Sequence, residues 1–233
     1  MPNRTVETSR QFYARLAGFT FLFYMAVGST LHLLMNQATN AEGTVAILAH
    51  IADHAANVRI SVLLSLLESF SALLLAVALY GITRIYDHEL AMLAMACRIS
   101  EGVIGAIFGV PLKLGLLWLA TSGPGVGGPD VATAHTIGAY LLMPIESVLI
   151  GSLFFAIGSM IFSYLLLRGR MVPVLLAWSG VLASVLLVLA IPLQLSGFFQ
   201  VPLYVWIPMA VFQVVLGFWL LIKGVSTPTL RQP

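Results

Sequence analysis

Four ionisable side chains lie inside long apolar stretches of the sequence: Glu68, Arg98, Glu101 and Glu146. Placing each of them at the centre of a membrane helix costs about 2.5–3.5 kcal/mol, so each should have a partner. At a rise of about 1.5 Å per helical residue, all four fall at a similar depth near the middle of the apolar layer. We therefore predict that they meet in one intramembrane site and are its catalytic residues.

Arg98 and Glu101 are three residues apart, which places them on one face of a helix and predicts an ion pair within that helix. Two carboxylates are then left over. If Glu68 and Glu146 also face Arg98, three acids share one guanidinium, and one of the acids is available to donate a proton. The alternative is that the network only holds its helices together.

A second polar cluster is expected toward the outer face of the membrane. It comprises His32, His50, Asp53, His54, Arg59 and His135. His50 and His54 are four residues apart, a spacing that puts two imidazoles on one side of a helix at metal-chelating distance, with His32 or His135 as the third ligand. Haem ligation by His32 and His135 and ordinary interfacial histidines are the alternatives, and the cofactor itself stays unknown. Arg59 and His135 are also predicted to bind a ligand.

Composition places these residues in an all-α polytopic membrane helix bundle. Of the 233 residues 60% are hydrophobic and only 9% are charged, against roughly a quarter charged in soluble domains. About 20 apolar residues cross the hydrocarbon layer as a helix, so the chain holds six transmembrane helices in one domain, 1–233. The predicted spans are 16–35, 58–82, 90–119, 137–167, 172–193 and 203–222, with a short surface helix near 46–55.

The distribution of positive charge predicts the orientation. Arginine and lysine precede the first span, follow the last one and occupy the connections after the second and fourth spans, whereas the other three connections have none. By the positive-inside rule both termini lie in the cytoplasm, and we expect a multi-pass protein of the bacterial inner membrane. The scattered net charge of +2 offers no basic block, so nucleic acid is not expected as a partner. Lys113, near the outer end of its span, is expected to reach the headgroups.

Several segments resemble an uncharacterised bacterial integral-membrane family, domain of unknown function 4386. They are LLSLLESFSALLLAVALYGI at 63–82, LAMLAMACRISEGVIG at 90–105, SLFFAIGSMIFSYLLLRGRMVPVLLAWSGVLAS at 152–184 and FWLLIKGV at 218–225. The family's better-marked positions would map to Arg98, Glu101, Gly102, Pro173, Lys223 and Gly224. Where the family commonly has a glutamate in the last span, this chain has Gln213, which we count as a third ligand-binding candidate. The resemblance supports the fold and implies no activity.

Three functions compete. In the first, the charged site binds a lipid-like or isoprenoid small molecule or transforms it by acid catalysis; MPIES at 143–147 is similar to an acidic motif of membrane carotenoid and terpene cyclases, with Ser147 where the second acid would be. In the second, the acids serve a small-molecule or proton-coupled transporter. In the third, the buried ions only specify helix pairing in a non-catalytic partner protein. Membrane lipid, a hydrophobic small molecule and a second copy of the chain are the partners to consider.

Overall fold

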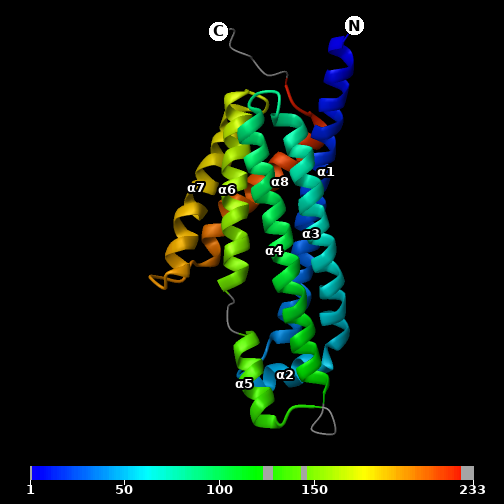
Figure 1. Ribbon diagram of the computed structural model, residues 1–233, viewed down its shortest axis with the longest axis vertical. Helices are drawn as coiled ribbons and strands as arrows, with labels where there is room; N and C mark the ends of the chain where they lie inside the picture. Colours follow the sequence, from blue (N-terminus) through cyan, green and yellow to red (C-terminus); the bar gives the residue numbers. More distant parts are fainter. Residues whose placement is uncertain (1, 123–127, 143–145, 227–233) are drawn as a thin grey trace. The chain divides into compact units, whose positions relative to one another are not determined.

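The computed structural model describes residues 2–122, 128–142 and 146–226, with the side chains of 2–6 and 146–148 outside this description. All regular elements in these ranges are helices, and no strand occurs there (Figure 1). In chain order they are α1 (Pro2–Thr39), α2 (Thr44–Asp53), α3 (Ala55–Thr83), α4 (His88–Thr121), α5 (Val131–Leu142), α6 (Glu146–Arg168), α7 (Val174–Leu195), the 3₁₀ turn η1 (Leu203–Trp206) and α8 (Ile207–Ile222).

Six helices of the described chain are long and apolar enough to cross a membrane, which confirms the predicted number. Five of the predicted spans correspond to α1, α3, α4, α7 and η1 with α8, and the predicted short helix corresponds to α2. The protein is therefore an all-α, multi-pass membrane protein. The length of the apolar stretches determines the number of membrane helices. The backbone of a membrane segment must satisfy its own hydrogen bonds, and a helix does this.

The predicted span over 137–167 includes residues 143–145, which lie outside the described residues. The structure has two helices there: α5 ends at Leu142, α6 begins at Glu146, and the stretch that can cross a membrane is Leu149–Arg168. Glu146 is the first residue of α6 that the structure describes.

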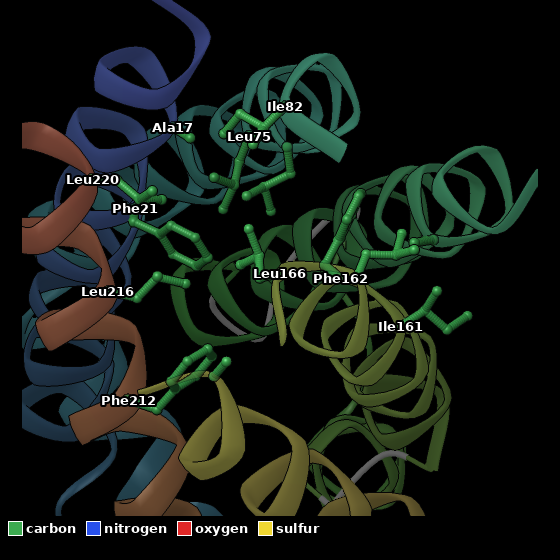
Figure 2. Packing of buried hydrophobic residues seen from close by; sticks show 14 of the residues in the cluster. Ala17, Phe21, Leu75, Ile82, Ile161, Phe162, Leu166, Phe212, Leu216 and Leu220 are labelled. Atoms are coloured by element: carbon green, nitrogen blue, oxygen red, sulfur yellow. The ribbon is translucent and has the colours of Figure 1, made fainter. Parts of the chain in front are cut away.

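Contacts divide the chain into two compact units. Unit 1 comprises Met1–Met25, Phe70–Gly102 and Leu149–Pro233, and unit 2 comprises Ala26–Ser69 and Val103–Val148. The core of unit 1 is a cluster of aliphatic and aromatic side chains, and Figure 2 shows part of it, with residues from α1, α3, α6 and α8 directed toward one another. Within this unit α7 packs against α8 (Figure 1).

Unit 2 has a smaller core of its own. Ala38, Ile51, Val58 and Leu116 are its buried members, and they come from α1, α2, α3 and α4. The two short helices α2 and α5 pack against each other in this unit (Figure 1). Leu48 of α2 lies so close to Gly138 of α5 that a Cβ added at this glycine would be 3.0 Å from a leucine methyl carbon.

The start of α5 is capped by Asp130. One carboxylate oxygen accepts the backbone N–H of Thr133 at 2.8 Å, and the other accepts the Thr133 hydroxyl at 3.1 Å. This is the arrangement that satisfies a free N–H at a helix start. Hydrogen bonds from the Thr133 backbone and side chain stabilise the charged form and hold the pKa of Asp130 below its ordinary value.

We predict that this cap depends on pH in one direction. Because the pKa of Asp130 is lowered in the folded protein, the cap is formed above the ordinary aspartate range and is lost as the pH falls through the folded-state pKa. An NMR titration should show a pKa for Asp130 below that of an exposed aspartate, and Thr133→Ala should move it upward. An unchanged pKa in Thr133→Ala would contradict the contribution of the Thr133 hydroxyl, and a wild-type pKa no lower than that of an exposed aspartate would contradict the cap.

Candidate functional site

The charged site of unit 1 is carried by the first half of α4. This helix begins after Asp87, whose carboxylate accepts the backbone N–H of Leu90 at 2.9 Å and thereby caps the helix. Arg98 and Glu101 follow about three turns later, in a stretch that is otherwise apolar. The helical repeat directs both side chains to the same face.

Arg98 and Glu101 form a buried ion pair, as the sequence predicted. Arg98 Nη1 lies 2.7 Å from Glu101 Oε2, and the two side chains are 1% and 10% exposed. The other carboxylate oxygen of Glu101 accepts the hydroxyl of Tyr24, at 2.9 Å, from α1. Both oxygens of Glu101 therefore face donors, and the pair joins two helices of unit 1.

Two aromatic rings and a glycine also lie against Arg98. The guanidinium carbon is 4.8 Å from the centre of the Phe155 ring and 5.8 Å from that of Tyr24. Such cation–π contacts contribute roughly 2 kcal/mol when water is excluded. On α6 a Cβ at Gly158 would be 3.0 Å from Arg98 Cγ and 3.1 Å from the Ala94 carbonyl oxygen. Gly158 thus makes room for the arginine stem.

The guanidinium has more donors than the described residues satisfy. Its Nε and Nη2 are buried and have no hydrogen-bond partner there. The Nη1 contact with Glu101 is short, but it lacks the direction of a hydrogen bond, so we treat it as an electrostatic contact. Buried N–H groups are nearly always paired in native proteins. The unpaired edge of Arg98 is the feature of this site that needs an explanation.

Unit 2 contains a second buried charge, on Lys113 of α4. Its side chain is only 9% exposed, and its Nζ donates to the carbonyl of Gly109 at 3.2 Å. The prediction that Lys113 reaches the headgroups is therefore wrong. The opposite charge that acts on it comes from Glu68 of α3, and Glu68 in turn lies against α1, where a Cβ at Gly28 would be 2.6 Å from its Oε1. A buried lysine with a carboxylate partner has no need to extend to water.

The structure brings together two of the four predicted catalytic residues, Arg98 and Glu101. Glu68 belongs to unit 2, where it interacts with Lys113. The side chain of Glu146 lies outside the described residues. A single site containing all four remains a prediction.

The predicted three-histidine metal site does not form in the part of the chain that the structure describes, where no group of three His, Cys, Asp or Glu side chains could hold a metal ion. His50 and His54 do lie side by side, with ring centres 4.3 Å apart. However, Nδ1 of His54 is 3.0 Å from the His50 carbonyl, and Nδ1 of His50 is 3.4 Å from the Ala38 carbonyl. The exposed His32 does not join them. This leaves a pair of neighbouring, tilted rings at the junction of α2 and α3.

The three predicted ligand-binding residues differ in their surroundings. Arg59 and His135 are exposed in unit 2, whereas Gln213 on α8 is buried in unit 1, with an exposed fraction of 5%. Its amide nitrogen has no hydrogen-bond partner among the described residues. The ligand-binding roles of all three remain predictions.

Sequence reasoning missed Tyr24, Phe155 and Lys113. One signal was available for Tyr24, because it lies about as deep in the first predicted span as Glu101 does in the third. Phe155 gave none, since one aromatic residue in an apolar stretch is indistinguishable from its neighbours. Lys113 was misplaced because its distance from the helix end allowed both headgroup contact and burial.

The sequence profile described as "Domain of unknown function (DUF4386)" matches residues 16–224 of this chain. No curated protein matches it. No solved structure matches it either.

We predict that the buried pair is destabilising when half of it is removed. Arg98→Met should lower the free energy of unfolding by about 3–5 kcal/mol because Glu101 is left charged in an apolar interior. Arg98→Met combined with Glu101→Leu should be clearly more stable than Arg98→Met alone. Cys97 is the only cysteine and is buried, so a thiol-reactive dye reports unfolding. Thermal unfolding followed with this dye compares the stabilities of the single and the double variant. A double variant no more stable than Arg98→Met would contradict the pair.

We also predict unequal reactivity of the two lysines, Lys113 and Lys223. Lys113 is buried and Lys223 is exposed at the end of α8. In the folded protein a small amine-reactive ester should modify Lys223 at least about tenfold faster, because burial excludes the reagent from Lys113. Peptide mass spectrometry over a time course measures both rates in one sample. Equal rates in the folded protein would contradict the burial of Lys113. Rates that differ in the folded protein and become equal after unfolding are the expected result.

Proposed function

Because this chain belongs to the domain of unknown function 4386 family, whose description assigns no activity, we propose a function from the site itself. The protein is an integral membrane protein that binds an apolar small molecule with a polar head, and the head accepts hydrogen bonds from Arg98. Glu101 and Tyr24 hold the guanidinium in position for this contact.

The observation that carries the proposal is the unpaired edge of Arg98. Nε and Nη2 form one edge of the planar guanidinium, which offers two parallel donors to an oxygen-bearing group. In this chain that edge is buried, and no described residue accepts from it. Leaving a buried charged donor unsatisfied costs about 1–3 kcal/mol or more. A ligand oxygen at this edge removes that cost and gains a charge-assisted hydrogen bond.

The arrangement favours binding over acid catalysis. A general acid needs a proton to give away, but Glu101 faces the Tyr24 hydroxyl with one oxygen and the Arg98 guanidinium with the other. Both contacts use Glu101 as an acceptor, which is the role of a carboxylate. Its most direct function is to neutralise and orient Arg98. A role as lipid-cyclising acid or as proton carrier has no comparable support in the site.

Arg98→Lys tests the proposal directly. Lysine keeps the positive charge beside Glu101 but lacks the two-donor edge. We expect at least one of three probes with matched twelve- or thirteen-carbon skeletons, 2-tridecanone, dodecanoate and dodecyl phosphate, to bind the wild-type protein in nanodiscs at least about tenfold more tightly than the Arg98→Lys variant. A tenfold loss corresponds to about 1.4 kcal/mol, within the range of one hydrogen bond to a charged group. Native mass spectrometry across a series of probe concentrations gives the affinities.

Arg84→Lys is the matched control. Arg84 also lies over a tyrosine ring, that of Tyr80 at 5.8 Å, but it is exposed. Its substitution should leave the affinities unchanged. If no probe distinguishes wild type from Arg98→Lys, or if both substitutions weaken binding equally, the proposed function is wrong.

A further inference from the structure

By helix register, Gln213 falls at the height of Tyr24 within unit 1. The antiparallel helices α1 and α8 touch where a Cβ at Gly18 would be 2.6 Å from the Gly217 carbonyl, and where a Cβ at Gly217 would be 3.3 Å from Phe21 Cβ. Gln213 precedes Gly217 by four residues and Tyr24 follows Phe21 by three, so each is one turn further along the pair in the same direction. Tyr24 holds Glu101, the partner of Arg98.

The buried groups without hydrogen-bond partners at this level are mostly donors. The donors are Nε and Nη2 of Arg98 and the amide nitrogen of Gln213. The acceptor is Glu101 Oε2, which already faces Arg98 Nη1 at 2.7 Å. A bound head group therefore has to supply acceptors. An ammonium or amine head would bring further donors and leave those of the protein unsatisfied.

Charge balance further limits the chemical class of the head group. Arg98 and Glu101 neutralise each other. Among the described residues of unit 1, Arg10 is the other buried arginine, and its Nη2 donates to the Ser226 carbonyl at 3.4 Å. The groups that act on Glu101 are Arg98 of its own helix and Tyr24 of α1. A carboxylate or phosphate head would place a second negative charge next to Glu101 without a second cation. A neutral carbonyl supplies two lone pairs and leaves the pair balanced.

We infer that the ligand of this site carries a neutral carbonyl head, as in a ketone, ester or quinone with an apolar tail, and that Gln213 is a second donor to that head beside Arg98. This inference rests on the proposed function and gives its ligand a chemical class. In this arrangement Gln213 selects an acceptor, because its amide nitrogen donates where a glutamate would present a carboxylate oxygen.

The test compares heads on matched tails in the full-length protein in nanodiscs, by native mass spectrometry. 2-Tridecanone should bind at least about tenfold more tightly than dodecanoate and dodecylammonium. Gln213→Leu should weaken 2-tridecanone about three- to tenfold, and Gln213→Glu should weaken it as much while improving dodecylammonium. Gln200→Leu, at an exposed glutamine, should change nothing. Thermal unfolding reported by Cys97 shows that each variant is folded.

The outcomes separate this inference from the proposed function. Tighter binding of dodecanoate than of 2-tridecanone, still dependent on Arg98, overturns the carbonyl head and leaves the proposed function standing. Preference for 2-tridecanone with full affinity in folded Gln213→Leu overturns the role of Gln213. Affinities that are the same in wild type and Arg98→Lys overturn the proposed function itself.

Discussion

A guanidinium in an apolar interior has five N–H donors and one positive charge, and the protein must compensate both. In this chain Glu101 compensates the charge of Arg98 at 2.7 Å, and the rings of Phe155 and Tyr24 cover the faces of the cation. The donors are only partly compensated, because Nε and Nη2 have no acceptor among the described residues. Charge neutrality without hydrogen-bond saturation is the property from which the proposed ligand site follows.

Two other helices of unit 1 contact the buried ion pair of Arg98 and Glu101. Gly158 leaves space for the arginine stem on α6, and Tyr24 brings α1 to the carboxylate of Glu101. In unit 2 the buried Lys113 lies where the charge of Glu68 acts on it and where the Gly109 carbonyl accepts a hydrogen bond from its ammonium group. Each unit thus has a buried cation beside an acid, Arg98 with Glu101 and Lys113 with Glu68, but of these two cations only Arg98 retains nitrogens without a hydrogen-bond partner among the described residues.

The sequence predicts what depends on a single helix and fails where contacts depend on helix rotation. The number of membrane helices follows from apolar length, and the ion pair follows from the spacing of Arg98 and Glu101. Contacts such as Tyr24 with Glu101, or Glu68 with Lys113, join different helices. When every face of a helix is apolar, no hydrophobic period reveals which face points inward.

The most direct test of this account is an experimental density map of the protein purified from membranes with its lipids retained. We expect density within hydrogen-bond distance of Arg98 Nε and Nη2 that belongs to no side chain of the protein, with an apolar tail leading away from it. A carboxylate of the protein itself, such as that of Glu68 or Glu146, bonded to both nitrogens would contradict the account, because the guanidinium would then need no ligand.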